Sequence, residues 1–126
     1  MKPILVINDD SKLLGEISSV LREGGYYHLI ASSGSEAMTL ASGYDFALVL
    51  LDLKLPDIDG DALYDKLLLA ESHYDLPIVA LIDGLDAEEV KVINRLVPKR
   101  AVTLFSKPLQ REWLDELFAR YGHKKR

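Results

Sequence analysis

Short runs of apolar residues recur along the chain, and each ends at polar or turn-forming residues. Uninterrupted runs of this length are typical of strands that are buried on both faces, as in a parallel sheet, and they predict strands at residues 4–7, 45–51 and 78–82. Residues 26–31 are less apolar and predict a strand nearer the edge of the sheet. Residues 101–105 predict the last strand.

Between these strands, apolar residues recur with the 3.6-residue period of an α-helix. Asp10 or Ser11 can cap the first helix, and Asp86 can cap the fourth. Glycine or proline follows several of these segments, as is usual at helix ends. Helices are therefore expected at Leu13 to Leu21 with a stop at Gly24, Ala37 to Leu40 with a stop at Gly43, Asp61 to Ser72, Val90 to Val97 before Pro98, and Leu109 to Tyr121.

Strands and helices alternate strictly along the chain, without a linker, an internal repeat or a low-complexity segment. This alternation indicates an α/β fold in which five helices cover both faces of a five-stranded, doubly wound parallel sheet. We expect the flavodoxin-like strand order 2-1-3-4-5, one of two common orders. The 126 residues predict a single domain, residues 1–126, with an ordered core over residues 1–121 and a frayed basic tail over residues 122–126.

Composition narrows the functions that such a fold could have. The net charge of −5 argues against non-specific nucleic-acid binding, and the absence of cysteine excludes disulfides and thiolate chemistry. The sequence contains no glycine-rich phosphate-binding motif, signal peptide or run of membrane-spanning length. We therefore expect a cytoplasmic protein that contacts neither nucleic acid nor membrane directly.

Carboxylates follow two of the predicted strands, Asp9 after the first and Asp52 at the end of the third. Open α/β sheets bind ligands at the carboxyl ends of their strands. In the flavodoxin-like order, strands one and three are neighbours, so Asp9 and Asp52 would share one crevice, with Lys107 at its rim. Two carboxylates about 4 Å apart repel by roughly 4 kcal/mol at an effective dielectric constant near 20, so a cation is expected there.

Mg²⁺ suits such a site because it prefers carboxylate and carbonyl oxygens and keeps several waters. An aspartate beside this ion and a lysine can attack a phosphoryl group and form an aspartyl-phosphate. From the residues alone, other interpretations stay open: Asp52 could merely cap a loop, and the fold could be that of a small phosphatase or a flavin-binding protein. Residues 57–61 lack the spacing of a calcium-binding loop.

Four segments, in the correct order and covering nearly the whole chain, resemble the receiver domain of two-component response regulators. They are residues 4–10, residues 31–37, residues 50–60 and Lys107-Pro108. The resemblance implies that Asp52 is phosphorylated by a histidine kinase or a phosphotransfer protein in a phosphorelay. It implies Mg²⁺ binding by Asp9, Asp52 and the backbone carbonyl of Lys54. It also implies that Lys107 pairs with the phosphoryl oxygens, in a signalling domain that is no metabolic enzyme.

The sequence departs from the family pattern at positions that the resemblance links to switching. Asn8 replaces an acidic residue, which should weaken metal binding. Ile82 replaces a Thr or Ser hydroxyl, so a charge-assisted hydrogen bond worth roughly 1.5–3 kcal/mol is lost. Asp83 replaces a small residue and adds negative charge. Leu104 stands at the aromatic switch position, while Phe105 lies one position later and on the opposite face of the strand.

These departures favour an atypical receiver in which coupling to the helix-four, strand-five and helix-five face is weak. A pseudo-receiver that acts as a phosphorylation-independent interaction module is the alternative. The fourth predicted helix carries Val92 beside Val90 and Ile93, more apolar surface than one buried face requires. This surplus suggests a homodimer through the same face.

Overall fold

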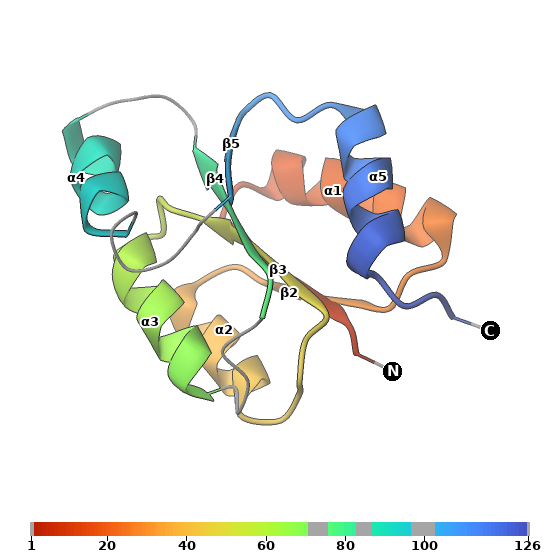
Figure 1. Ribbon diagram of the computed structural model, residues 1–126, viewed down its shortest axis with the longest axis horizontal. Helices are drawn as coiled ribbons and strands as arrows, with labels where there is room; N and C mark the ends of the chain where they lie inside the picture. The colour runs from red at the N-terminus through yellow and green to blue at the C-terminus, as the bar shows by residue number, and fades with distance from the viewer. Residues whose placement is uncertain (1, 71–75, 83–86, 97–102, 126) are drawn as a thin grey trace.

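The computed structural model describes residues 2–70, 76–82, 87–96 and 103–125 (Figure 1). Within these residues, strands and helices alternate as the sequence predicts. The strands are β1 (Ile4–Ile7), β2 (His28–Ala31), β3 (Leu48–Asp52), β4 (Ile78–Ile82) and β5 (Thr103–Ser106). The helices are α1 (Ser11–Gly24), α2 (Gly34–Ala41), α3 (Gly60–Ala70), α4 (Ala87–Leu96) and α5 (Arg111–Tyr121).

The strands form one parallel sheet in the order β2-β1-β3-β4-β5, which confirms the predicted flavodoxin-like topology. Helices α1 and α5 cover one face of this sheet, and α2, α3 and α4 cover the other (Figure 1). Each face carries its own apolar core, because every residue of the inner strands β1 and β3 is buried and successive side chains point to opposite faces.

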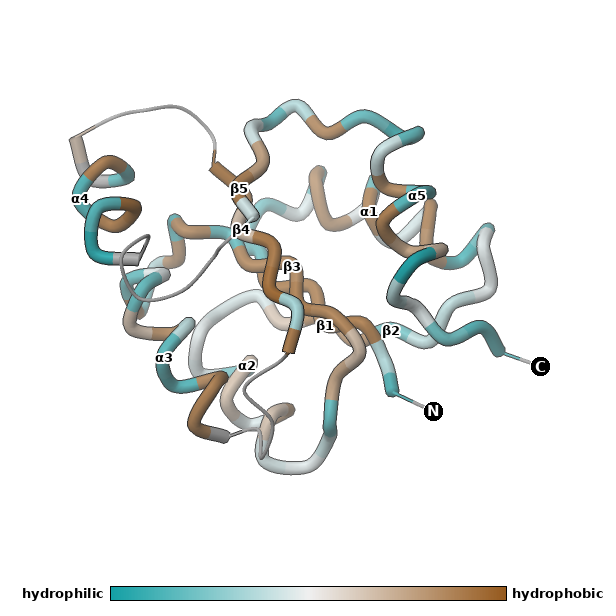
Figure 2. Tube along the Cα trace, viewed as in Figure 1, coloured by the Kyte–Doolittle hydropathy of each residue, from teal (hydrophilic) through white to brown (hydrophobic). Residues whose placement is uncertain are grey.

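The edge strands are more exposed than the inner strands β1 and β3, in which every residue is buried. Figure 2 shows the inner strands in brown, the colour of hydrophobic residues. Strand β2 is only partly buried, which confirms its predicted place at an edge. Strand β5 forms the other edge and has exposed residues at both of its ends.

The first helix has the capping residues that its sequence predicts. The Asp10 carboxylate accepts hydrogen bonds from the backbone N–H groups of Lys12 (3.0 Å) and Leu13 (3.3 Å). Gly25 follows the helix with φ of 71°, a left-handed conformation that favours glycine. The Asp10 cap thus begins α1 directly after β1, and Gly25 ends it before β2.

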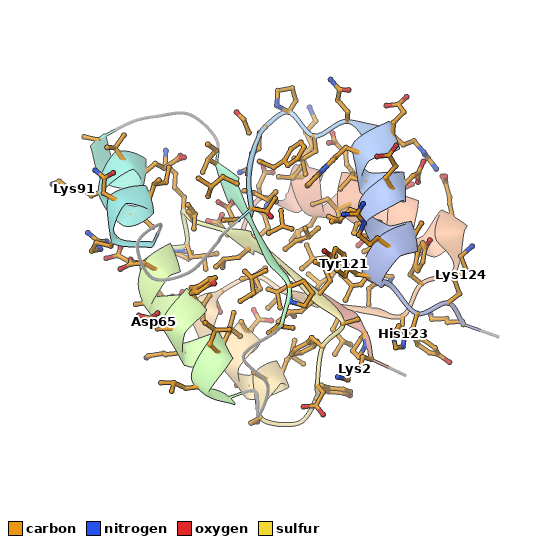
Figure 3. The ribbon with its side chains drawn as sticks, in the orientation of Figure 1. Lys2, Asp65, Lys91, Tyr121, His123 and Lys124 are labelled. Atoms are coloured by element: carbon orange, nitrogen blue, oxygen red, sulfur yellow. The ribbon has the colours of Figure 1, made fainter. Side chains whose placement is uncertain are left out.

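Residues 122–125 of the basic tail, for which the sequence suggests a frayed end, lie against the turn between α1 and β2. The Tyr27 N–H donates to the His123 carbonyl at 3.0 Å, and the Lys125 N–H donates to the Gly25 carbonyl at 2.6 Å. His123 and Lys124 follow α5 near the C-terminus (Figure 3). The Lys124 ammonium lies 5.5 Å from the centre of the Tyr26 ring. Backbone hydrogen bonds to the α1–β2 turn therefore hold the tail in place.

Helix α4 presents a different face to the core from the one that its apolar pattern predicts. Val90 is 38% exposed, whereas Glu89 and Val92 are buried. The apolar surplus that suggested a dimer surface is thus smaller than expected, because Val92 is used in the core. Asp83, Asp86 and Val97 lie outside the described residues. No helix in the described part of the chain is long and apolar enough to cross a membrane.

Candidate functional site

The strands end together at one edge of the sheet, which brings distant parts of the chain close to one another. Ile7 pairs with Leu51, so Asn8 and Asp9 follow β1 beside the end of β3. The N–H of Lys107 donates to the Ile82 carbonyl at 2.8 Å, which extends the pairing of β5 with β4 to Lys107. The peptide bond from Lys107 to Pro108 is cis.

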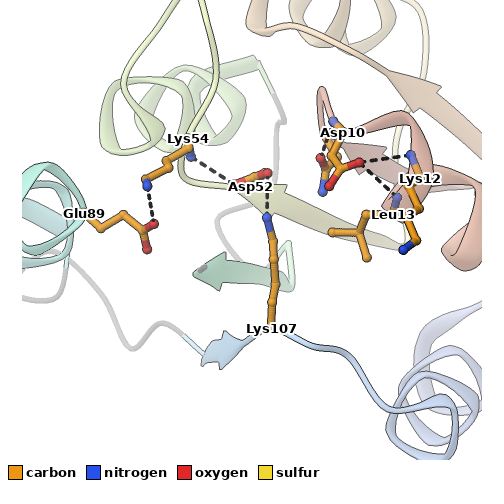
Figure 4. Close-up of polar contacts among 8 residues, drawn as sticks. Asp10, Lys12, Leu13, Asp52, Lys54, Glu89 and Lys107 are labelled. Atoms are coloured by element: carbon orange, nitrogen blue, oxygen red, sulfur yellow. Dashed lines mark hydrogen bonds and ion pairs between the residues drawn. The ribbon is translucent and has the colours of Figure 1, made fainter. Parts of the chain in front are cut away.

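Asp52 is the centre of this edge. It ends β3 and is 3% exposed. The ammonium of Lys107 lies 3.1 Å from Asp52 Oδ2, and the backbone N–H of Lys54 donates to Asp52 Oδ1 at 3.0 Å (Figure 4). Both carboxylate oxygens are therefore held by positively polarised groups, and Lys107, which the sequence places at the rim of this crevice, contacts Asp52 directly.

Burial raises the pKa of the Asp52 carboxyl above its usual value, because a charged group loses hydration inside the protein. The hydrogen bond from the Lys54 N–H and the charge of Lys107 favour the ionised form and oppose this rise. The negative charge of Asp9 raises the pKa of Asp52 further. Asp9 follows β1 at the same edge of the sheet, so its charge acts on Asp52 from the neighbouring strand.

Asn8 lies at the same edge and is completely buried. Its Oδ1 accepts the backbone N–H of Asp10 at 2.8 Å, while its Nδ2 has no hydrogen-bond acceptor among the described residues. A buried amide donor without a partner usually indicates a missing water or ligand.

The donor set fits a hard cation. Among the described residues, no group of three or more carboxylate or imidazole side chains gathers in one place. The site therefore offers the two carboxylates of Asp9 and Asp52, together with backbone oxygen at the end of β3. Mg²⁺ is commonly held by one or two carboxylates and keeps the rest of its shell as water, so these residues suit it.

The switch positions have the apolar character that the sequence indicates. Ile82 ends β4 opposite Ser106 and is half-buried. Leu104 packs against the core on the α2–α4 side of the sheet, while Phe105 packs on the other side. The Phe105 ring stacks on Trp113, with 3.6 Å between ring centres, so it is held against α5.

Several contacts around the site were not foreseen from the sequence. The Lys54 ammonium forms an ion pair with Glu89 of α4, and Arg95 of the same helix contacts Asp59 and Asp61. The Asp57 carboxylate accepts two N–H groups at the start of α2. The three carboxylates of residues 57–61, the segment compared above with a calcium-binding loop, thus all form contacts with other parts of the fold. The backbone of this segment also packs tightly, since a Cβ at Gly60 would lie 2.9 Å from the Leu53 Cα.

Comparison with known proteins agrees with this geometry. The family model of the response regulator receiver domain matches residues 4–119. The cell cycle response regulator CtrA of Brucella ovis is 32% identical over 117 residues, which cover 93% of this chain and 47% of that protein. The probable transcriptional regulator ycf29 of Porphyra purpurea is 30% identical over 92 residues, 72% of this chain and 44% of that protein. The chain thus spans about half the length of these curated relatives.

Solved structures share the fold. A CheY-like receiver domain protein from Methanospirillum hungatei has a TM-score of 0.77 at 24% identity, covering 95% of this chain and 92% of its own. The receiver domain of the sensor histidine kinase PA1611 from Pseudomonas aeruginosa, described with magnesium in its active site cleft, has a TM-score of 0.78 at 23% identity over 95% and 96% of the two chains. Taken together, the family match, the topology and the acidic sheet edge show that this chain belongs to the response regulator receiver domain family.

Proposed function

We propose that this domain accepts a phosphoryl group on Asp52 and so acts as a signalling phosphoacceptor. The observation that carries the proposal is the contact between Lys107 Nζ and Asp52 Oδ2 at 3.1 Å. The buried carboxylate of Asp52 contacts an ammonium group at the edge of the sheet that also carries Asp9. These charges can stabilise a phosphoryl group that is transferred to Asp52. The remaining Asp52 oxygen is held by a single backbone N–H, which keeps the side chain in one orientation.

In this proposal the Asp52 carboxylate is the nucleophile. One of its oxygens forms a bond to phosphorus while the bond between phosphorus and the donor histidine nitrogen breaks. The leaving imidazole keeps the electron pair and takes a proton from solvent. Lys107 follows the developing negative charge on the phosphoryl oxygens, because its ammonium already lies beside Asp52.

Asp9, Asp52 and the backbone carbonyl of Lys54 are the residues that would hold Mg²⁺. When it is bound, Mg²⁺ neutralises charge on the carboxylates and on the incoming phosphoryl group. The raised pKa of Asp52 is consistent with this role, since burial and the charge of Asp9 both disfavour its ionised form until a cation compensates. The magnesium described for the PA1611 receiver domain supports the same assignment.

The proposed phosphodonor is a histidine kinase or a phosphotransfer protein of a phosphorelay in the cytoplasm. The domain would catalyse its own phosphorylation and dephosphorylation, and it would not turn over a metabolite. The matched region covers about half of each of the curated relatives, so the proposal concerns the receiver domain and leaves the output that follows phosphorylation open.

A pseudo-receiver is the second candidate, and it is favoured by the lack of a hydroxyl at Ile82 and of charge at Asn8. Magnesium binding separates the two functions. A titration with Mg²⁺, followed by amide resonances, should give saturable shifts around Asp9 and Asp52 in the phosphoacceptor. Asp9→Asn should abolish these shifts, while Asp45→Asn, at an exposed position before β3, should leave them unchanged. The absence of saturable shifts in the unaltered chain would support the pseudo-receiver.

A further inference from the structure

A glutamate is buried where α4 meets the functional site. Glu89 is the third residue of α4 and is 1% exposed. Its Oε1 lies 3.2 Å from the ammonium of Lys54. Carboxylates are rarely buried to this degree unless a positive group compensates them, so the position of Lys54 and that of α4 depend on each other.

Lys54 contacts two parts of the molecule through its two ends. Its backbone N–H donates to Asp52 Oδ1 at 3.0 Å, and its side chain reaches Glu89 (Figure 4). One residue thus touches both the carboxylate that we propose to be phosphorylated and the first turn of α4.

The opposite end of α4 is attached separately. Arg95 Nε lies 2.8 Å from Asp61 Oδ2, and Arg95 Nη2 lies 3.1 Å from Asp61 Oδ1. This bidentate pair with a nearly buried carboxylate holds the last turn of α4 on the start of α3. The first turn of α4 is therefore the end that can respond to Lys54.

We propose that Glu89 is a positioning residue that acts through Lys54 and couples the charge at Asp52 to the position of the first turn of α4. This inference rests on the proposed function for its biological meaning. It gives the domain a route from the phosphorylation site to α4 that needs neither a hydroxyl at Ile82 nor an aromatic side chain at Leu104.

The coupling follows from competition for one ammonium group. A phosphoryl group on Asp52 adds negative charge beside the Lys54 peptide and attracts the Lys54 side chain. If Lys54 moves toward that charge, its ion pair with the buried Glu89 weakens, and the first turn of α4 is free to adjust its position. By thermodynamic reciprocity, a partner that displaces α4 would also change the charge around Asp52.

The coupling can be tested without phosphate, by changing the charge at Asp52 itself. Asp52→Asn removes this charge and retains an oxygen that can accept the Lys54 N–H. We expect Asp52→Asn to shift the amide resonances of residues 87–91. The same substitution in a Glu89→Gln background should shift these resonances by less than half as much, since the ion pair with Lys54 is gone.

Two further variants keep the test decisive. Lys54→Met breaks the ion pair from its exposed end and should reduce the α4 response as Glu89→Gln does, even if one of the two variants is poorly folded. Glu116→Gln makes the same carboxylate-to-amide change at an exposed position of α5 and should leave the response intact. An α4 response of full size in both Glu89→Gln and Lys54→Met would overturn the proposal, as would no response in the unaltered background.

The result is separable from that of the proposed function. Phosphorylation of Asp52 is read by a mass gain, whereas the coupling is read by the response of α4 to Asp52→Asn. A chain that takes up no phosphate but shows the Glu89-dependent response would refute the phosphoacceptor assignment alone. A chain that is phosphorylated but shows no such response would refute the coupling alone.

Discussion

Lys107 Nζ lies 3.1 Å from Asp52 Oδ2, although β4 separates the strands that carry the two residues. The lysine side chain therefore crosses the end of β4, where Ile82 is the last residue of the strand. The contact forms because the parallel strands all end at one edge of the sheet. For this reason the ammonium of Lys107, which follows the edge strand β5, can pair with the carboxylate of Asp52 on the central strand β3.

Replacing Lys107 should slow phosphorylation more than it alters the fold. We expect Lys107→Met to lower the rate of phosphorylation by a small donor by about 10²-fold, as for loss of one preorganised charge donor in other enzymes. The rate is measured from the growth of the phosphorylated species in intact-mass spectra. Lys66→Met, at an exposed position of α3, is the matched control. A rate equal to that of the control would show that Lys107 has no role in the transfer.

Restoring an acid at position 8 should strengthen magnesium binding. Asn8→Asp keeps an oxygen for the Asp10 N–H and replaces the unpartnered Nδ2 with a second oxygen. We expect Mg²⁺ affinity to rise by about tenfold, from one added charge near a divalent ion. When Mg²⁺ is removed with a chelator, Asn8→Asp should melt at a lower temperature than the unaltered chain, because its added buried charge is then uncompensated. Unchanged affinity would place Asn8 outside the metal site.

A hydroxyl at position 82 should restore a hydrogen bond to a phosphoryl mimic. Ile82→Thr should tighten beryllofluoride binding in Mg²⁺ by about tenfold or more, because a charge-assisted hydrogen bond contributes about 1.5–3 kcal/mol. Ile82→Val is the control, because valine has the shape of threonine but no hydroxyl. Both variants should lose about 1 kcal/mol of unfolding free energy from the missing methyl group. Equal beryllofluoride affinity of the two variants would contradict this expectation.

Asp57 should make stability depend on pH in the acid range. Hydrogen bonds from the N–H groups of Gly34 and Ser35, both 2.9 Å long, lower the pKa of Asp57 from its usual value of 3.8. The folded state thus favours the ionised form, and this stabilisation is lost as pH falls below 3.8 through the lowered pKa.

Asp57→Asn should therefore lower the melting temperature at neutral pH, because its amide group offers only one acceptor oxygen to the two donors. The difference from the unaltered chain should shrink as the pH falls below 3.8. Thermal unfolding followed by circular dichroism over this range measures it. A difference that stays constant with pH would show that the charge of Asp57 contributes nothing.

The sheet and the acidic edge could be predicted from sequence because both follow from local patterns. Apolar runs identify inner strands such as β3, and a parallel sheet then places all strand ends together. Asp52 and Lys107 meet for this reason, and no knowledge of side-chain packing was needed to expect it.

The orientation of α4 could not be predicted, because its apolar residues fit two helical phases. The apolar pattern places Val90 on the buried face, whereas the structure exposes Val90 and buries Glu89 and Val92, with Ile93 packed against the same core. The second phase is stabilised by the ion pair between Glu89 and Lys54, a tertiary contact that leaves no periodic signal. The tail beyond α5 is held mainly by backbone hydrogen bonds, which do not depend on residue type.

The most direct test of the central claim is the intact mass of the chain after incubation with a small phosphodonor and Mg²⁺. We predict a gain of one phosphate that requires Mg²⁺, disappears in Asp52→Asn and persists in Asp45→Asn. No gain at saturating donor, or a gain that survives in Asp52→Asn, would contradict the assignment of Asp52 as the phosphoacceptor.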